Sequence, residues 1–224
     1  MIQIHKQAAF DLASIMLMLV AVKQLMLPYS FLLAGPASTF SAMILATWLL
    51  SRRGLSWADL GLRKPEKLIR TLVLSVVSFL TIALIASGMS WLTDFFFVGV
   101  GDSGRFNHVE GNLPAYLLMM LLVWTHGSLF EELLFRAFLI NRGSAALGGG
   151  LKADLVAVLL SSVFFGYRHY YYQGIKGAII TGSIGLGLSL LYLWFGRSNI
   201  LPLILGHGLV NTLSQTQRYL GDTG

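Results

Sequence analysis

The chain has 224 residues, of which 55% are hydrophobic and only 12% are charged, and its mean hydropathy is +0.71. An ordinary soluble domain carries about 25% charged residues, so this composition excludes one, and the same hydrophobicity excludes a disordered chain. The absence of cysteine excludes disulfide frameworks and thiolate metal sites, and the net charge of +6 is carried between apolar runs, which indicates membrane topology rather than nucleic-acid binding.

Long apolar runs recur along the chain, and most approach the roughly 20 residues that a membrane-spanning helix needs. The alternation typical of a membrane β-barrel is not visible, so helices are the expected spanning structure. We predict an all-α fold, a polytopic membrane helix bundle of about seven transmembrane helices. The expected spans are roughly 9–27, 31–50, 71–93, 111–141, 155–167, 177–196 and 198–217.

The first apolar run follows His5 and Lys6, as the apolar segment of a cleaved signal peptide would. The run is too long for that class of segment and lacks a clear small-residue cleavage site, so an uncleaved first span is the preferred interpretation. We treat residues 1–224 as a single membrane domain, in which 1–110 holds the N-terminal helices and a cytoplasmic loop.

The charges between the spans predict the orientation of the chain. The connection 51–70 is basic, and the positive-inside rule places it in the cytoplasm. The connection 94–112 is more acidic and fits the opposite side, and alternation then returns Arg142 and Lys152 to the cytoplasm. Arg168 and Lys176 are expected on the far side, against the rule. The basic residues of the connection 51–70 are Arg52, Arg53, Arg63, Lys64, Lys67 and Arg70, against Asp59 and Glu66. The expected location is the cell (cytoplasmic) membrane, as a multi-pass integral protein.

Small residues recur in the span 177–196, which in lipid allows helix backbones to approach closely. The glycine run 148–150 follows no predicted strand, so we interpret it as a cytoplasmic turn rather than a phosphate-binding loop.

Three charged residues fall inside the fourth span: Glu131, Glu132 and Arg136. Placing three charges near the middle of a membrane helix costs on the order of 7–10 kcal/mol before any pairing. Glu132 and Arg136 are four residues apart, so they can pair along one helix. Glu131 points about 100° away from Glu132 and therefore needs a partner on another helix, or water.

Two further spans carry polar residues at similar depths. His169 follows the fifth span, and His207 and Asn211 share a face of the seventh because they are four residues apart. From the expected cytoplasmic ends, Glu131 lies about 16 Å deep, His169 about 22 Å and His207 about 10–13 Å. These levels are compatible with one pocket within the membrane. Each feature alone has a structural interpretation as an interfacial ion pair, an interfacial anchor or an interhelical hydrogen bond.

The sequence resembles the CAAX-protease and bacteriocin-processing family of intramembrane proteases. Three motifs carry the resemblance: Glu131-Glu132-Leu-Leu-Phe-Arg136 matches EExxxR, Phe165-Gly-Tyr-Arg-His169 matches FxxxH, and His207-Gly-Leu-Val-Asn211 matches HxxxN. The loop 56–63 also resembles one that often precedes the core of the family. The resemblance makes residues 111–218 the expected catalytic core. Ala137 stands where the family often has glycine, and the additional helix of eukaryotic members is not expected, which puts prenylated CAAX substrates in doubt.

The resemblance implies hydrolysis of a peptide bond within or beside the membrane. Glu131 would be the general base and His169 would help it activate water. His207 and Asn211 would stabilise the oxyanion, while Glu132 and Arg136 would brace the helix. Burial disfavours the charged form of a carboxylate, which suits a proton acceptor that works near neutral pH.

The same residues leave the role of a metal open. Glu131, His169 and His207 could hold zinc with an open water position, although the HExxH helix of ordinary metalloproteases is missing. Asn211 is a poor zinc ligand and a good oxyanion donor, so we favour a mechanism without cofactor, of glutamic type.

Two other classes of function compete with an intramembrane endopeptidase. One is a proton-coupled transporter or channel, since buried carboxylates often line ion paths, but no internal repeat is visible. The other is a catalytically silent immunity or scaffold protein of the same fold. The expected partners are the lipid bilayer and a membrane-tethered protein or peptide, with no nucleic acid. The substrate, the side to which the site opens and the oligomeric state stay open.

Overall fold

The computed structural model describes residues 2–97, 104 and 106–221, and their regular structure is helical throughout. The predicted all-α membrane bundle is confirmed in class. The elements in chain order are α1 (Ile2–Met26), α2 (Ala34–Arg52), α3 (Leu68–Asp94), η1 (Asn107–Val109), α4 (Leu113–Trp124), η2 (Thr125–Phe130), η3 (Leu133–Phe138), α5 (Leu139–Ala146), α6 (Gly150–Trp194) and α7 (Leu201–Tyr219).

Four helical stretches among the described residues are long and apolar enough to cross a bilayer: His5–Met26, Leu68–Asp94, Leu113–Ala146 and Gly150–Trp194. The third of them runs from α4 through η2 and η3 to α5. The count of seven spans stays a prediction, because it also needs α2, α7 and both arms of α6 to cross.

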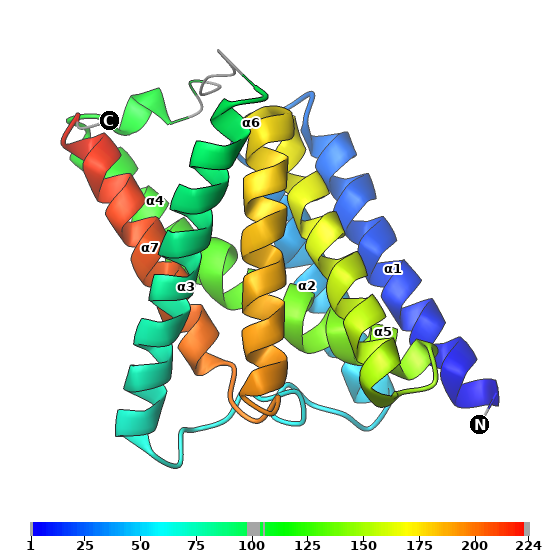
Figure 1. Cartoon of the computed structure of the whole chain (residues 1–224). Helices are drawn as coiled ribbons and strands as arrows, with labels where there is room; N and C mark the ends of the chain where they lie inside the picture. The colour runs from blue at the N-terminus through cyan, green and yellow to red at the C-terminus, as the bar shows by residue number, and fades with distance from the viewer. Residues whose placement is uncertain (1, 98–103, 105, 222–224) are drawn as a thin grey trace.

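Helix α6 is a hairpin of two arms. A straight helix of its 45 residues would measure about 67 Å, more than twice the hydrocarbon core of about 30 Å. The chain turns at Gly174, whose φ of 63° and ψ of −168° belong to a region that only glycine enters readily. In Figure 1 one arm rises to this turn and the other descends beside it. The predicted end of the fifth span at 167 is therefore too early, since the helix continues to the turn.

The predicted close packing of the small residues in 177–196 is confirmed. Backbone atoms of Gly182 lie 3.0–3.2 Å from the place where a Cβ of Gly166 would stand, so the two arms of α6 meet at their backbones. On the other side of the second arm, a Cβ at Gly187 would stand 2.4 Å from the Ile85 side chain of α3. The glycine run 148–150 forms the predicted turn between α5 and α6, with positive φ throughout.

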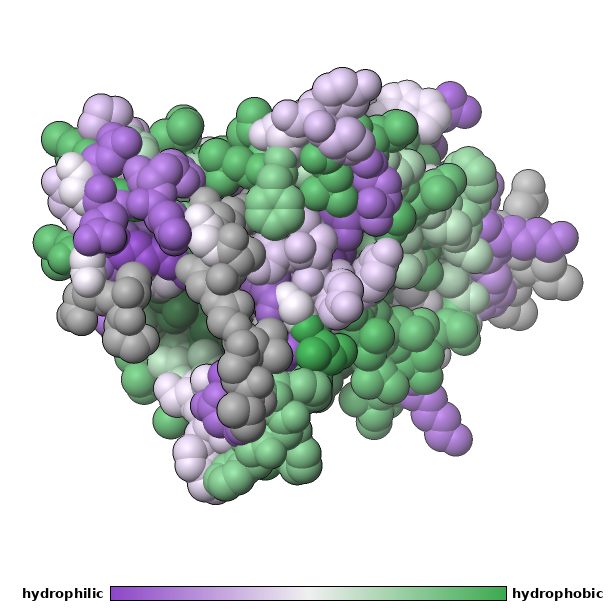
Figure 2. Space-filling model, turned by 90° about the horizontal axis from the view of Figure 1, so that it is seen from above, coloured by the Kyte–Doolittle hydropathy of each residue, from purple (hydrophilic) through white to green (hydrophobic). Residues whose placement is uncertain are grey.

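The helices surround a core centred on η3. Helix α1 packs against α2 and α5, α3 packs against α6 and α7, and α4 packs against α7. Large apolar side chains such as Leu17, Ile44 and Leu84 are exposed around the bundle, where they would face lipid. Figure 2 views the bundle from above, at the end that is uppermost in Figure 1. It shows hydrophobic residues around the periphery and hydrophilic residues gathered over this upper end.

The loop between α2 and α3 is fixed to the lower end of the bundle. The Tyr192 hydroxyl donates to the carbonyl of Leu60 at 2.9 Å, and the backbone N–H of Ile200 donates to the carbonyl of Gly61 at 3.0 Å. Within the loop, hydrogen bonds from the hydroxyl and the backbone N–H of Ser56 lower the pKa of the Asp59 carboxyl. The loop is thus an ordered part of the fold.

Candidate active site

The acidic pair Glu131–Glu132 lies between the π-helical segments η2 and η3. A π-helix closes its hydrogen bonds over five residues instead of four, and the Ser128 hydroxyl donates to the carbonyl of Val123 over the same interval at 2.8 Å. Glu131 is 6% exposed and Glu132 is 0% exposed. The expected helix is continuous here, but its wide turns change which side chains share a face. Such segments are frequent at functional sites.

Glu132 lies between a guanidinium and an imidazole. Its Oε1 is 3.2 Å from NH1 of Arg136 and 2.8 Å from Nδ1 of His207. A carboxylate only accepts hydrogen bonds, so His207 donates its Nδ1–H. The predicted pair of Glu132 and Arg136 is confirmed, and Glu132 also connects the helix of the acidic pair to α7.

Arg136 is 0% exposed and connects the first two motifs. Its Cζ lies 4.3 Å from the ring centroid of Phe165, a cation–π contact. Among the described residues, its Nε and NH2 have no hydrogen-bond partner. The Glu132 carboxylate and the Phe165 ring therefore compensate for the cost of burying the Arg136 charge.

His169 extends from the first arm of α6 with its ring fixed at one nitrogen. Nδ1 of His169 lies 2.7 Å from the carbonyl oxygen of Phe165. The imidazole also packs edge to face against the Phe165 ring, with 4.6 Å between the ring centroids. A carbonyl cannot donate, so Nδ1 carries the proton. In the neutral ring the lone pair is then on Nε2, which makes this nitrogen a proton acceptor.

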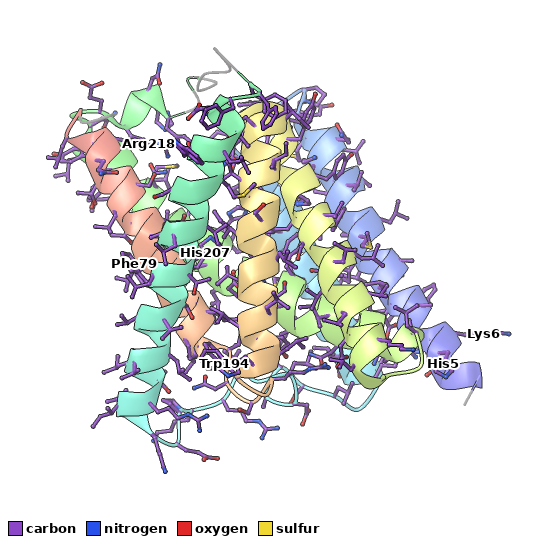
Figure 3. All side chains as sticks on the ribbon, viewed as in Figure 1. His5, Lys6, Phe79, Trp194, His207 and Arg218 are labelled. Carbon is purple, nitrogen blue, oxygen red and sulfur yellow. The ribbon has the colours of Figure 1, made fainter. Side chains whose placement is uncertain are left out.

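His207 and Asn211 occupy one face of α7, as predicted. The Asn211 amide donates to the carbonyl of Gly127 at 3.2 Å, which ties α7 to η2. Glycines precede and follow His207. A Cβ at Gly206 would stand 2.6 Å from Ser78 of α3, and one at Gly208 would stand 2.5 Å from the Trp124 ring. Both glycines that flank His207 therefore lie in close contact with neighbouring helices. Figure 3 labels His207 midway along α7.

The structure brings four of the predicted site residues to one cavity of about 260 Å³, which is lined by Glu131, His169, His207 and Asn211. Glu132 and Arg136 do not line it, and they lie behind its wall. The cavity holds room for several water molecules among polar partners. The arrangement thus combines a buried carboxylate, two imidazoles and an amide around a space that water can enter.

His126 and Arg168 also line the cavity, although neither was among the predicted site residues. His126 lies with its Nε2 4.0 Å from Oε1 of Glu131, because residues five apart face each other in the π-helix η2. Arg168 is 6% exposed and donates to the carbonyl of Leu19 at 2.6 Å and to the Thr39 hydroxyl at 3.2 Å. Its expected place beyond the membrane helix is wrong. Two signals in the sequence pointed to Arg168: its position directly before His169, and its expected place on the far side against the positive-inside rule.

No group of three or more His, Cys, Asp and Glu side chains within the described part of the chain is arranged as a metal site. Glu131, His169 and His207 share the cavity wall without forming such a group. The choice between a glutamic and a metal mechanism stays a prediction.

Comparison with known proteins gives one match. A family model described as Type II CAAX prenyl endopeptidase Rce1-like matches residues 113–213. No curated protein and no solved structure matches the chain. The matched segment contains all three motifs and extends from the start of α4 into α7. Residues 113–213 are therefore similar to the Rce1-like CAAX endopeptidases, in agreement with the resemblance that the three motifs carry.

Proposed function

We propose that the protein is an intramembrane endopeptidase that cleaves a membrane-associated protein or peptide in the cell membrane, by a glutamic mechanism without cofactor. The observation that carries the proposal is the single cavity lined by Glu131, His169, His207 and Asn211. Residues from three separate helical elements meet there, and all of them lie within the segment that the family model matches.

The first step in this proposal is the activation of water. The Glu131 carboxylate takes a proton from a water molecule while the oxygen of that water attacks the scissile carbonyl carbon. Nε2 of His169 accepts a hydrogen bond from the same water, since its Nδ1–H is donated to the carbonyl of Phe165. When the C–N bond breaks, the proton held by Glu131 passes to the leaving nitrogen. A positioned acid–base group of this kind contributes about 10² to 10⁴ in rate.

The negative oxygen formed by the attack is stabilised by α7. The Asn211 amide has two N–H groups, and one is used by the carbonyl of Gly127, so the other can donate to the oxyanion. His207 donates its Nδ1–H to Glu132, and a second proton on Nε2 would make it an imidazolium that donates to the oxyanion. The buried Glu132 carboxylate stabilises that charged ring. Each oxyanion donor in a dry site contributes about 3 kcal/mol.

The test replaces the proposed base and its neighbour. Glu131→Gln and His169→Ala should each lower cleavage of a membrane-tethered reporter by at least about 10²-fold, while the purified variants unfold at the same temperature as the wild type. Glu66→Gln and His108→Ala are matched controls, because both residues are exposed and neither lines the cavity. Full cleavage by Glu131→Gln would exclude Glu131 as the base and with it the proposed mechanism, whereas a reporter that the wild type leaves uncleaved would favour the silent scaffold. Proteins that accumulate uncleaved with Glu131→Gln are the substrates.

The metal-dependent alternative has a separate test. Purified enzyme is incubated with a strong chelator and then assayed with and without added zinc. The glutamic mechanism predicts unchanged cleavage after chelation. Activity that is lost with the chelator and returns with zinc would instead assign Glu131, His169 and His207 as metal ligands.

A further inference from the structure

The catalytic cavity reaches one end of the bundle. Its wall includes Leu32 in the turn between α1 and α2, Gln173 beside the hairpin turn of α6, and Arg218 in the last turn of α7. The stretch of α7 from His207 to Arg218 measures about 17 Å. Figure 3 shows His207 at mid-height and Arg218 near the upper end. The cavity therefore extends from the middle of the bundle to the upper end in this view.

The lower end is closed by packed side chains. Glu132, Arg136 and Tyr192 are 0% exposed, Phe135 is 1% exposed, and none of them lines the cavity. The Asn141 amide donates to the Tyr192 hydroxyl at 2.8 Å, beneath the buried ion pair. A peptide therefore has no path to Glu131 from the lower end.

The charges of the two ends differ strongly. Among the described residues, the upper end carries Asp94 and Glu110 together with Lys176, Arg218 and the buried Lys23 and Arg168, and Lys176 forms an ion pair with Asp94. Most of the basic residues lie at the lower end, in the N-terminal part of α1, in the loop between α2 and α3 and the helix turns beside it, in α5 and the start of α6, and in the turn before α7 (Figure 1). These residues are Lys6, Arg52, Arg53, Arg63, Lys64, Lys67, Arg70, Arg142, Lys152 and Arg197, and the acidic residues at the same end are fewer: Asp11, Asp59, Glu66 and Asp154.

Lys and Arg residues in short loops mark the cytoplasmic side of a membrane protein. The closed lower end is then cytoplasmic, and the open end of the cavity faces away from the cytoplasm. We propose that the substrate is a membrane-anchored peptide segment that has already been translocated, and that it enters the cavity from the non-cytoplasmic side. The inference rests on the proposed protease function and adds the side and the class of substrate.

The depth of the cavity sets a requirement on such a substrate. An extended chain advances about 3.3 Å per residue, so about five residues are needed to cover the 17 Å between the levels of Arg218 and His207 along α7. The segment that enters must therefore be unfolded next to its cleavage site. A translocated peptide or the extracytoplasmic flank of a membrane anchor has this property.

The chain has no cysteine, so a single introduced thiol reports its own side of the membrane. Ser214→Cys places it on the cavity wall, Tyr170→Cys at the exposed upper end, and Ala58→Cys in the exposed basic loop. Each variant is expressed in a bacterial cytoplasmic membrane and treated in intact cells with a membrane-impermeant maleimide. We expect Ser214→Cys and Tyr170→Cys to be labelled, and Ala58→Cys to be labelled only after the cells are permeabilised.

Labelling of Ala58→Cys in intact cells would overturn the proposal, and so would a Ser214→Cys that reacts only in permeabilised cells. External modification of Ser214→Cys should also stop cleavage of a substrate identified with Glu131→Gln. If the labelling is reversed while Glu131→Gln still abolishes cleavage, the substrate side is wrong and the protease stands. If the labelling is as expected but the wild type does not cleave, the protease and the substrate class are both lost, while the topology remains.

Discussion

Gly206 and Gly208 show how single residues set the position of a catalytic candidate. Each lies one residue from His207, and each allows a neighbouring helix to approach closer than a methyl group would permit. The contact of Gly206 is with the backbone and Cβ of α3, which cannot rotate away, whereas Gly208 faces the ring of Trp124. We therefore expect position 206 to be the more sensitive of the two.

Gly206→Ala should separate α3 from α7 and displace His207. Overpacking of this kind costs about 1–3 kcal/mol, so the variant should unfold at a lower temperature and cleave more slowly. Gly88→Ala is the matched control, because it adds the same methyl group to α3 with nothing within 4 Å, and alanine is the better helix former by about 1 kcal/mol. Equal behaviour of the two variants would show that the close approach at Gly206 is not needed.

The ion pair of Glu132 and Arg136 acts at the scale of elements, since it connects the helix of the acidic pair to α6 through Phe165 and to α7 through His207. Removing one partner leaves an uncompensated buried charge, which costs about 3–5 kcal/mol. Arg136→Met alone should therefore destabilise the protein strongly.

The double variant Glu132→Gln with Arg136→Met should recover much of that loss, because the buried charges are removed together. Cleavage should stay low, since His207 no longer has a carboxylate to stabilise its charged form. Thermal unfolding in detergent and reporter cleavage measure the two effects separately. A double variant that is both stable and fully active would show that Glu132 only braces the helix.

The elements also show what the sequence can and cannot predict. The pairing of Glu132 with Arg136 follows from a spacing of four residues, which any regular helix brings together. The contact between His126 and Glu131 depends on the π-helix η2, in which hydrogen bonds close over five residues instead of four. No motif that we identified in the sequence indicates this change. The hydrogen bond from His207 to Glu132 was also beyond prediction, because helical rise gives the depth of a residue but not the rotation of its helix.

At the scale of the molecule, the apolar runs were sufficient to predict an all-α membrane bundle, while the orientation that the loop charges indicate stays a prediction. The apolar runs failed at Arg168, which a rule based on hydrophobicity places in water. In the structure its guanidinium donates to Leu19 of α1 and Thr39 of α2, so the charge is solvated by the protein.

The position of Arg168 has a consequence for dividing the chain. Through this residue, the arm that carries His169 is fastened to two helices that lie outside the matched residues 113–213. Pro36 of α2 and Ile82 of α3 supply further parts of the cavity wall. A fragment beginning at residue 111 would keep every motif, yet lipid would fill the space left by three missing helices and leave Arg168 without its acceptors. The motif-bearing half therefore lacks part of the cavity wall by itself, and the N-terminal helices complete the cavity.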